Sequence, residues 1–177
     1  MKRQFYKKKM KLTEEFNIKK ISFLKFENIY LIIFILLIFF LDRFSKNEIL
    51  KNFSDNNYFV NNYINLDLVW NTGIGFGLFS YDSSLIYGAI TALICLIIIF
   101  LLYYIIILKR PDNFIFSIII GGALGNFYDR LFYNAVPDFI DLHYNNFHWF
   151  TFNVADIFIT FGIISYLVRG YFIKTNK

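Results

Sequence analysis

The stretch Ser83–Leu108 contains no charged residue and is almost entirely apolar. At about 20 residues per crossing, it is long enough to span a lipid bilayer as a single helix. The whole chain is also more apolar than a typical soluble protein, with 57% hydrophobic residues and a mean hydropathy of +0.48. The sequence therefore predicts a membrane protein.

Three more apolar stretches are shorter or interrupted, and they lie at 28–41, 113–128 and roughly 147–168. The first two of these span a bilayer only if flanking residues are included or the bilayer thins locally. The last reaches full length only if Asp156 is counted inside it. We therefore predict an all-α membrane protein with four transmembrane helices, a basic arm at 1–27, a membrane domain at 28–170 and a tail at 171–177. The expected spans are about 28–42, 83–108, 113–128 and 149–168.

The distribution of Lys and Arg predicts the orientation. Nine of the 18 lie between Lys2 and Lys25, whereas 52–108 and 131–168 contain none. The positive-inside rule then places both termini in the cytoplasm and the loops 42–82 and 129–148 outside. The basic arm fits retention in the cytoplasm and contact with anionic lipid better than nucleic-acid binding. A cleaved signal peptide is the alternative for the first stretch, but no small-x-small cleavage site follows Leu41.

The first outer loop has a different pattern. Its apolar residues Ile64, Leu66, Leu68 and Trp70 alternate with polar ones, which predicts a small β-sheet lying on the outer leaflet. A glycine-rich segment follows, with Gly73, Gly75 and Gly77. In the third expected span, Gly121 and Gly125 form a small-xxx-small pattern that allows close helix packing.

Two aspartates are the main functional candidates. Asp138 stands in Val-Pro-Asp-Phe-Ile and Asp156 in Phe-Asn-Val-Ala-Asp-Ile, where an ionisable group is costly. The orientation puts both at the outer face. Counting back from Arg169 starts the last span near Trp149, so Asp156 is expected about 10 Å below the outer edge. Two carboxylates that share a proton can activate a water molecule.

Five clusters of polar and small residues accompany these acids in a fixed order. They are Asp42-Arg43-Phe44-Ser45-Lys46, Asn71-Thr72-Gly73-Ile74-Gly75-Phe76-Gly77, Gly121 to Arg130, Val136 to Asp141, and Phe152 to Asp156. In this order and spacing the chain resembles the lipoprotein signal peptidases, the signal peptidase II family, from about residue 28 to residue 170. Arg43 stands where Gln is usual in the family, and Gly75 where Ala is common.

The resemblance implies an integral-membrane aspartic endopeptidase. It implies removal of the signal peptide from bacterial prolipoproteins, with cleavage just before a cysteine that carries diacylglycerol. Asp138 matches the V-x-D-F pattern and Asp156 the F-N-x-A-D pattern of the two catalytic acids. The supporting polar residues match Asp42, Lys46, Asn71, Gly77, Asn126, Asp129, Arg130 and Asn153. It further implies a bacterial cytoplasmic (inner) membrane location, no cofactor, no metal, no nucleic acid and no obligate protein partner beyond substrate and lipid.

Several residues keep more than one interpretation. Asp129 and Arg130 are expected to form a salt bridge, Asp42 to make a structural contact, and Lys46 to pair with an acid or a lipid headgroup. Asn126 and Asn153 fit hydrogen bonding either to the two acids or to the substrate backbone. Outside the motifs, Asp141 is expected to be a solvated loop charge, and His143 with His148 lacks a third zinc ligand.

Two other functions compete with a peptidase. A small proton- or ion-coupled transporter also uses intramembrane acids, although transporters place them near the midplane between repeated halves. A structural membrane protein is the third hypothesis, and it leaves the glycines, asparagines and paired acids without a role.

Overall fold

A computed structural model describes residues 26–53, 57–73 and 84–175. Contacts divide the chain into two units, Met1–Tyr30 and Leu31–Lys177, and the arrangement below concerns the second unit. The elements follow the order helix, two strands, two helices, two strands, helix. They are α2 (Phe26–Asn52), β1 (Tyr58–Asn61), β2 (Ile64–Asn71), α3 (Ser84–Ile107), α4 (Asp112–Tyr133), β3 (Val136–Tyr144), β4 (Phe147–Phe152) and α5 (Val154–Thr175). The basic arm expected at 1–27 lies almost wholly outside the described residues.

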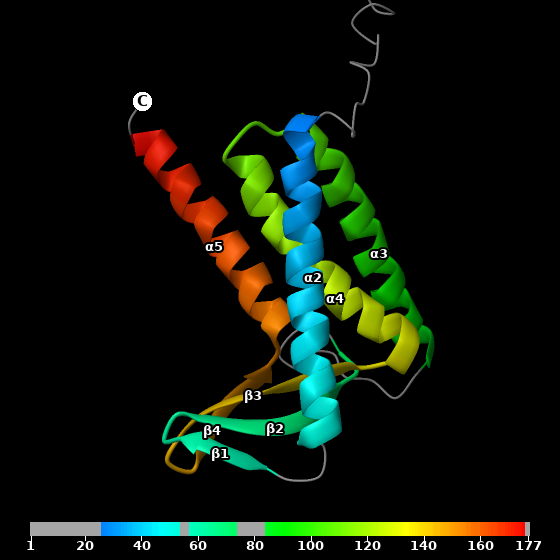
Figure 1. Ribbon diagram of the computed structural model, residues 1–177, viewed down its shortest axis with the longest axis vertical. Coiled ribbons are helices and arrows are strands. Elements are labelled where there is room, and N and C mark those ends of the chain that lie inside the picture. The colour runs from blue at the N-terminus through cyan, green and yellow to red at the C-terminus, as the bar shows by residue number, and fades with distance from the viewer. Residues whose placement is uncertain (1–25, 54–56, 74–83, 176–177) are drawn as a thin grey trace, which may run out of the picture. The chain divides into compact units, whose positions relative to one another are not determined.

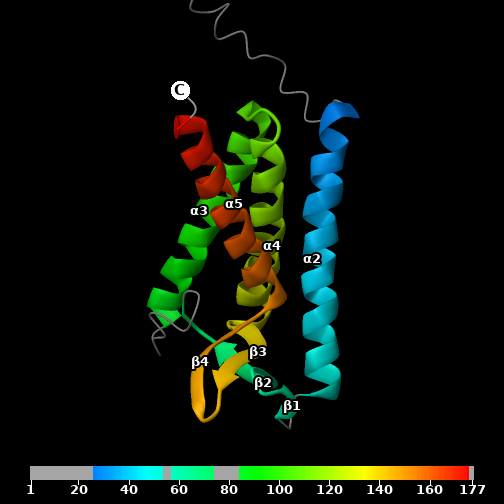
Figure 2. The ribbon, with the colours of Figure 1, turned by 90° about the vertical axis from the view of Figure 1, so that its left-hand side faces the viewer.

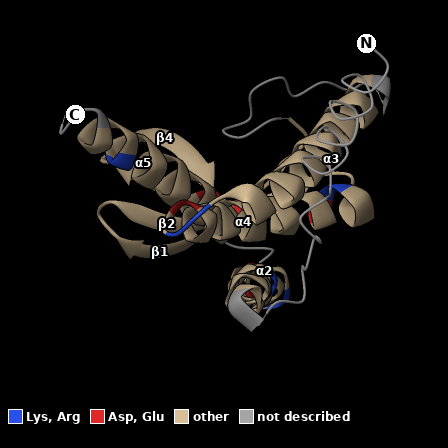
Figure 3. Cartoon of the chain, turned by 90° about the horizontal axis from the view of Figure 1, so that it is seen from above, with Lys and Arg blue, Asp and Glu red and all other residues tan. Residues whose placement is uncertain are grey.

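Three helices are long and apolar enough to cross a membrane among the described residues, which supports the prediction of a membrane protein. Their candidate spans are Asn28–Asn52, Ile86–Ile107 and Val154–Ile173. Charged residues are sparse along the helical ribbons (Figure 3). The helix α4 is not one of the three, and it packs against both α3 and α5 (Figure 2).

The strands form one antiparallel sheet in the order β1-β2-β3-β4. It lies at the end of the helices where α4 ends and α5 begins (Figure 1). The expected sheet in the first outer loop is present, but the expectation was incomplete, because β3 and β4 come from the second loop. The strand β3 pairs with β2, for example Ile140 opposite Leu66 and Val136 opposite Asn71, and β4 pairs with β3. The period-two pattern of β2 shows a strand but not its partner, since strand pairing depends on the tertiary structure.

Two helix boundaries correct the sequence predictions. The first span was expected at about 28–42, whereas the helix α2 continues to Asn52 and includes Asp42 and Lys46, whose charges are buried in an ion pair. The last span was expected to begin near Trp149, but Phe147–Phe152 is the strand β4. Since α5 begins only at Val154, Asp156 lies in its first turn, so the expected helix start near Trp149 was wrong and the depth of Asp156 stays a prediction.

Glycines in α4 allow the helices to approach each other closely. A Cβ atom on Gly122 would lie 2.6 Å from the backbone oxygen of Ala155 in α5, and one on Gly121 would lie 2.8 Å from Cβ of Ile38 in α2. Such separations are well below van der Waals contact. The predicted face of Gly121 and Gly125 is therefore confirmed as a close contact with α2, and Gly122 brings the first turn of α5 against α4.

Candidate active site

Asp138 is placed by β3, on the sheet just after the end of α4. Asn134 ends α4 in the left-handed conformation, with φ of 55°, and the chain then enters the strand. Asp138 is 3% exposed and lies opposite Val69 of β2. Its two carboxylate oxygens accept hydrogen bonds from the side-chain amides of Asn153, at 2.6 Å, and Asn71, at 2.9 Å. Asp138, which the sequence placed in an apolar stretch, therefore lies on a β-strand and not in a helix.

Asp156 is placed by the N-terminal cap of α5. Asn153 is the N-cap residue, and its Oδ1 accepts a hydrogen bond from the Asp156 backbone amide at 3.1 Å. In return, Asp156 Oδ2 accepts one from the Asn153 backbone amide at 3.2 Å. This reciprocal pair is a capping box, here with Asp in the place of the usual Glu or Gln. The sequence Asn-Val-Ala-Asp therefore fixes the start of the helix and the carboxylate together.

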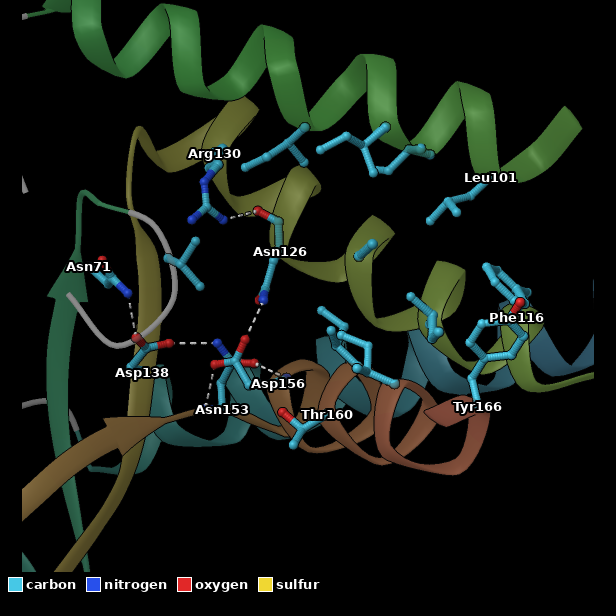
Figure 4. Close-up of a pocket in the computed structure, with 18 of the residues that line it drawn as sticks. Asn71, Leu101, Phe116, Asn126, Arg130, Asp138, Asn153, Asp156, Thr160 and Tyr166 are labelled. Atoms are coloured by element: carbon cyan, nitrogen blue, oxygen red, sulfur yellow. Dashed lines mark hydrogen bonds between the residues drawn. The ribbon is translucent and has the colours of Figure 1, made fainter. Parts of the chain in front are cut away.

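Asn153 connects the two acids, as Figure 4 shows. Its amide nitrogen donates to Asp138 while its amide oxygen caps the helix that carries Asp156. Asn153 is fully buried, so its side chain has a fixed environment. Asn126 of α4 adds a bond from Nδ2 to Asp156 Oδ1 at 2.8 Å. Of the two interpretations left open for Asn126 and Asn153, the structure supports hydrogen bonding to the two acids.

Behind Asp156 lies a buried ionic cluster formed by Asp42, Arg43, Lys46 and Asp129. Lys46 donates to Asp42 at 2.9 Å, to Asp129 at 2.7 Å and to Asn126 Oδ1 at 2.8 Å, which uses all three of its protons. Because Lys46 holds the amide oxygen of Asn126, the amide nitrogen faces Asp156. The prediction that Lys46 pairs with an acid is confirmed.

Arg43 completes the cluster. Its guanidinium donates to both oxygens of Asp129, at 2.5 and 2.8 Å, and to Asp42 at 2.9 Å. It also lies 4.8 Å from the centre of the Tyr128 ring, a cation–π distance. Two acids and two bases give the cluster a net charge of zero.

Asp42 has a structural role, as predicted. Its Oδ1 accepts a hydrogen bond from the Ala155 backbone amide at 3.0 Å, which satisfies another free N–H of the first turn of α5. A Cβ atom on Gly125 would overlap this carboxylate, so only glycine leaves room for it. The motif in α2 thus supports the helix that carries Asp156.

Arg130 corrects one expectation. The predicted salt bridge between Asp129 and Arg130 does not form, because Asp129 pairs with Arg43 and Lys46 on one side of α4. Arg130 instead donates to the backbone oxygen of Gly73 at 2.7 Å and to that of Asn126 at 3.2 Å. It therefore holds the backbone just after β2 beside α4. Gly77, another predicted supporting residue, lies outside the described residues.

A groove of about 560 Å³ begins at the two acids and continues between α3, α4 and α5. Its polar end contains Asn71, Asn126, Arg130, Asp138, Asn153 and Asp156 (Figure 4). The rest is almost entirely apolar, with Ile94, Ile98, Leu101, Phe116, Ile119, Ile159, Ile163 and Leu167 among its lining residues. The groove therefore suits an apolar chain or helix whose polar end lies at the acids.

The electrostatics of Asp138 match such a site. Burial raises the pKa of its carboxyl to about 6, and the nearby charge of Asp156 adds to the increase. The hydrogen bonds from Asn71 and Asn153 act in the opposite direction, because they stabilise the ionised form. A carboxyl with this pKa can hold a proton near neutral pH while a neighbouring acid is ionised.

One acid on the sheet differs from its prediction. Asp141 was expected to be a solvated loop charge, but it is 3% exposed and lies 2.7 Å from Nδ1 of His148. The strand β3 buries it, which the sequence pattern did not show. His143 is also buried, and its ring stacks on that of His148. Among the described residues, no group of three or more His, Cys, Asp or Glu has the arrangement of a metal site.

The predicted polar residues thus converge, with Gly77 as the one whose position is not described. Sequence reasoning missed Thr160, which lines the groove one helical turn after Asp156. The spacing of four residues could have revealed it, because residues four apart lie on the same face of a helix.

Comparison with known proteins gives the same picture. The family model described as signal peptidase (SPase) II matches residues 34–172. A protein of Pelagibacter ubique (strain HTCC1062) named lipoprotein signal peptidase is 46% identical over 155 residues, which cover 85% of this chain and 93% of that protein. A protein with the same name from Francisella tularensis subsp. novicida (strain U112) is 37% identical over 119 residues, covering 65% and 74%.

Solved structures agree as well. A bacterial membrane enzyme determined by the in meso method at 2.3 Å resolution superposes with a TM-score of 0.70 at 26% identity. The match covers 84% of this chain and 91% of the solved chain. The family resemblance predicted from the five clusters is therefore confirmed: the chain belongs to the signal peptidase II family.

Proposed function

We propose that this protein is an aspartic endopeptidase that removes the signal peptide from diacylglyceryl-modified bacterial prolipoproteins, cleaving before the lipid-modified cysteine. The family match and the relatives named lipoprotein signal peptidase support the peptidase activity and the prolipoprotein substrate. The observation that carries the aspartic mechanism is the pair Asp138 and Asp156, joined through Asn153 at the polar end of an apolar groove. No comparable support exists for the rival hypothesis of an ion-coupled transporter.

The environments of the two acids support different roles. Burial raises the pKa of Asp138 to about 6, which allows it to hold the shared proton. Each acid accepts two hydrogen bonds, so the donors do not distinguish them. Asp156 also lies in the first turn of α5, where the helix dipole favours a carboxylate. We therefore assign Asp138 as the acid and Asp156 as the base.

The reaction proceeds by addition of water to the scissile carbonyl. Asp156 takes a proton from water while the hydroxyl oxygen bonds to the carbonyl carbon, and Asp138 gives its proton to the carbonyl oxygen. The resulting diol collapses when the C–N bond breaks: Asp156 gives its proton to the leaving amine, and Asp138 recovers one from a hydroxyl. One water is consumed, the signal peptide leaves with a new carboxyl group, and the cysteine gains a free amine.

The groove accounts for substrate access. A signal peptide is an apolar helix and a diacylglyceryl group is lipid, so both can enter sideways from the bilayer into the space between α3, α4 and α5. The scissile bond then meets the acids at the end where the sheet lies. A lipid chain gains little free energy on leaving the bilayer, so shape and polar contacts near the cysteine must supply specificity.

We further propose four membrane spans, with α4 as the fourth. Its 22 residues extend about 33 Å, enough for a bilayer core. Its polar residues Asn126, Asp129 and Arg130 bond within the protein, so they are not exposed to lipid. The Lys and Arg distribution supports cytoplasmic termini and an extracytoplasmic active site in the cytoplasmic membrane of the bacterium. Reporter fusions after residues 60, 110 and 145 test this orientation, and a cytoplasmic signal at 60 or 145 would contradict it.

The proposed activity is tested with purified protein in detergent and a synthetic diacylglyceryl prolipopeptide. Mass spectrometry should detect the free signal peptide and a product that begins with the lipid-modified cysteine. Asp138→Asn and Asp156→Asn should each abolish cleavage while thermal unfolding stays cooperative. Asp67→Asn, on β2 outside the groove, is the matched control and should keep activity. Substantial cleavage by either of the first two variants refutes the aspartic mechanism.

A further inference from the structure

Thr160 and Tyr166 line the groove with hydroxyls that make no hydrogen bond among the described residues, and of the two Thr160 lies nearer to Asp156 along α5. The amides of Asn71, Asn126 and Asn153 bond to Asp138 or Asp156, and Arg130 bonds to backbone oxygens. Among the described residues, the Thr160 hydroxyl has no such partner. A donor that lines an apolar groove without a partner is available to a ligand.

Two hydroxyls in the neighbouring helices bond to their own backbone, whereas Ser165 of α5, which does not line the groove, makes no hydrogen bond among the described residues. Thr91 in α3 donates to the backbone oxygen of Tyr87, four residues earlier, at 2.9 Å. Ser117 in α4 donates to the backbone oxygen of Phe114 at 2.7 Å. This back-bonding is the usual way for a Ser or Thr in an apolar helix to satisfy its hydroxyl. Thr160 makes no such bond, although the same type of acceptor lies one turn before it.

The position of Thr160 relates it to the reacting end of the substrate. It lies four residues after Asp156, a rise of about 6 Å along α5 away from the first turn. Its neighbours in the groove, Ile159 and Ile163, are apolar. When the scissile bond of a substrate lies at the two acids, the carbonyl groups closest to that bond lie about 6 Å away, near Thr160. These are the acyl ester carbonyls of the diacylglyceryl group and the main-chain carbonyls of the signal peptide.

We propose that the Thr160 hydroxyl donates a hydrogen bond to a carbonyl oxygen of the bound substrate and is a specificity-determining residue. The proposal rests on the proposed function and extends it. In an apolar groove a bound carbonyl without a donor loses its hydrogen bond to water or headgroups, so Thr160 compensates for this loss. Because the bond forms in both the bound substrate and the transition state, it lowers KM and leaves kcat nearly unchanged.

The experiment compares Thr160→Val, which has the same shape without the hydroxyl, with Thr160→Ser, which keeps it. Thr160→Val should raise KM about three- to tenfold at nearly constant kcat, the range of one hydrogen bond, while Thr160→Ser should stay near wild type. Thr91→Val is the matched control, since Thr91 does not line the groove, and it should not change KM.

Two substrates distinguish the source of the carbonyl. One carries the ordinary diacyl ester, and the other carries an ether-linked dialkyl group that has no ester carbonyl. If the ester is the acceptor, Thr160→Val raises KM for the first substrate alone. If a main-chain carbonyl is the acceptor, KM rises for both, and the proposal also holds.

Two results overturn the inference. Unchanged KM in Thr160→Val with both substrates shows that no carbonyl bond exists, and an equal loss in Thr160→Ser shows that packing, not the hydroxyl, matters. These results leave wild-type cleavage intact, so they spare the proposed function. Absence of cleavage by the wild-type protein instead overturns the proposed function, and this inference with it.

Discussion

Replacing Arg43 with leucine removes one of the two positive charges of the buried ionic cluster. Asp129 then loses the bonds at 2.5 and 2.8 Å and Asp42 the bond at 2.9 Å. Both acids are fully buried, so Lys46 alone must compensate two carboxylates. Breaking a buried pair by removing one partner typically costs about 3–5 kcal/mol, and we expect a loss of unfolding free energy in this range.

A double-mutant cycle separates this charge imbalance from lost packing. Asp129→Asn alone leaves the cluster with an excess positive charge and should also destabilise the protein. Arg43→Leu with Asp129→Asn restores a net charge of zero, because Asp42 and Lys46 remain as a pair. The double variant should therefore lose less than the sum of the single losses, with a coupling of about 1–3 kcal/mol.

These free energies are measured by unfolding the protein in mixed detergent micelles, with tryptophan fluorescence as the signal. The ion pair between Arg169 and Asp112 provides a matched control, since its bond of 2.6 Å joins side chains that are 35% and 27% exposed. Arg169→Leu should cost less than about 1 kcal/mol, as exposed pairs do. The reasoning is refuted if Arg43→Leu costs no more than this control, or if the cycle is additive.

Two further predictions concern the acids and the helix contact behind them. If catalysis needs the protonated form of Asp138, kcat/KM should fall tenfold per pH unit above its pKa of about 6. Asn71→Ala removes a hydrogen bond that stabilises the carboxylate, so it should raise this pKa, and with it the pH at which kcat/KM falls, by about one unit. A pH profile that stays the same in Asn71→Ala contradicts the assignment. Gly122→Ala places a Cβ 2.6 Å from the Ala155 backbone oxygen, so it should lower the free energy of unfolding by about 1–3 kcal/mol and also lower kcat. The control Gly88→Ala, whose Cβ would have nothing within 4 Å, should be neutral or stabilising. Thermal unfolding and initial rates check both, and equal stability of the two variants would contradict the close packing.

The order and chemistry of the motifs could be predicted because they are local. Asn153, Val154, Ala155 and Asp156 form a capping box within one turn, so the same four residues that identify the motif also build it. The start of the last helix was mispredicted for the opposite reason. Phe147–Phe152 is apolar enough to continue the last span, yet it forms β4, because β3 offers an unpaired edge that no local pattern reveals.

The local sequence also failed to predict the partners of the buried charges. Asp129 and Arg130 are adjacent, and a salt bridge between them was the simplest expectation. The helix α4 instead directs Asp129 to Arg43 and Lys46 on α2, and Arg130 to Gly73. Neighbours in sequence point to different sides of a helix, so their partners are decided by the elements that pack there.

The sequence by itself determined the membrane class, the two candidate acids and the family, because hydropathy, charge distribution and short motifs are properties of contiguous residues. Only the tertiary structure decided how these features meet. Residues 71, 138 and 153 come together through strand pairing between two loops, and the groove with Thr160 exists only once α3, α4 and α5 pack. The physical reason is that strand pairing and helix packing depend on contacts between residues far apart in the chain, which local propensity does not encode.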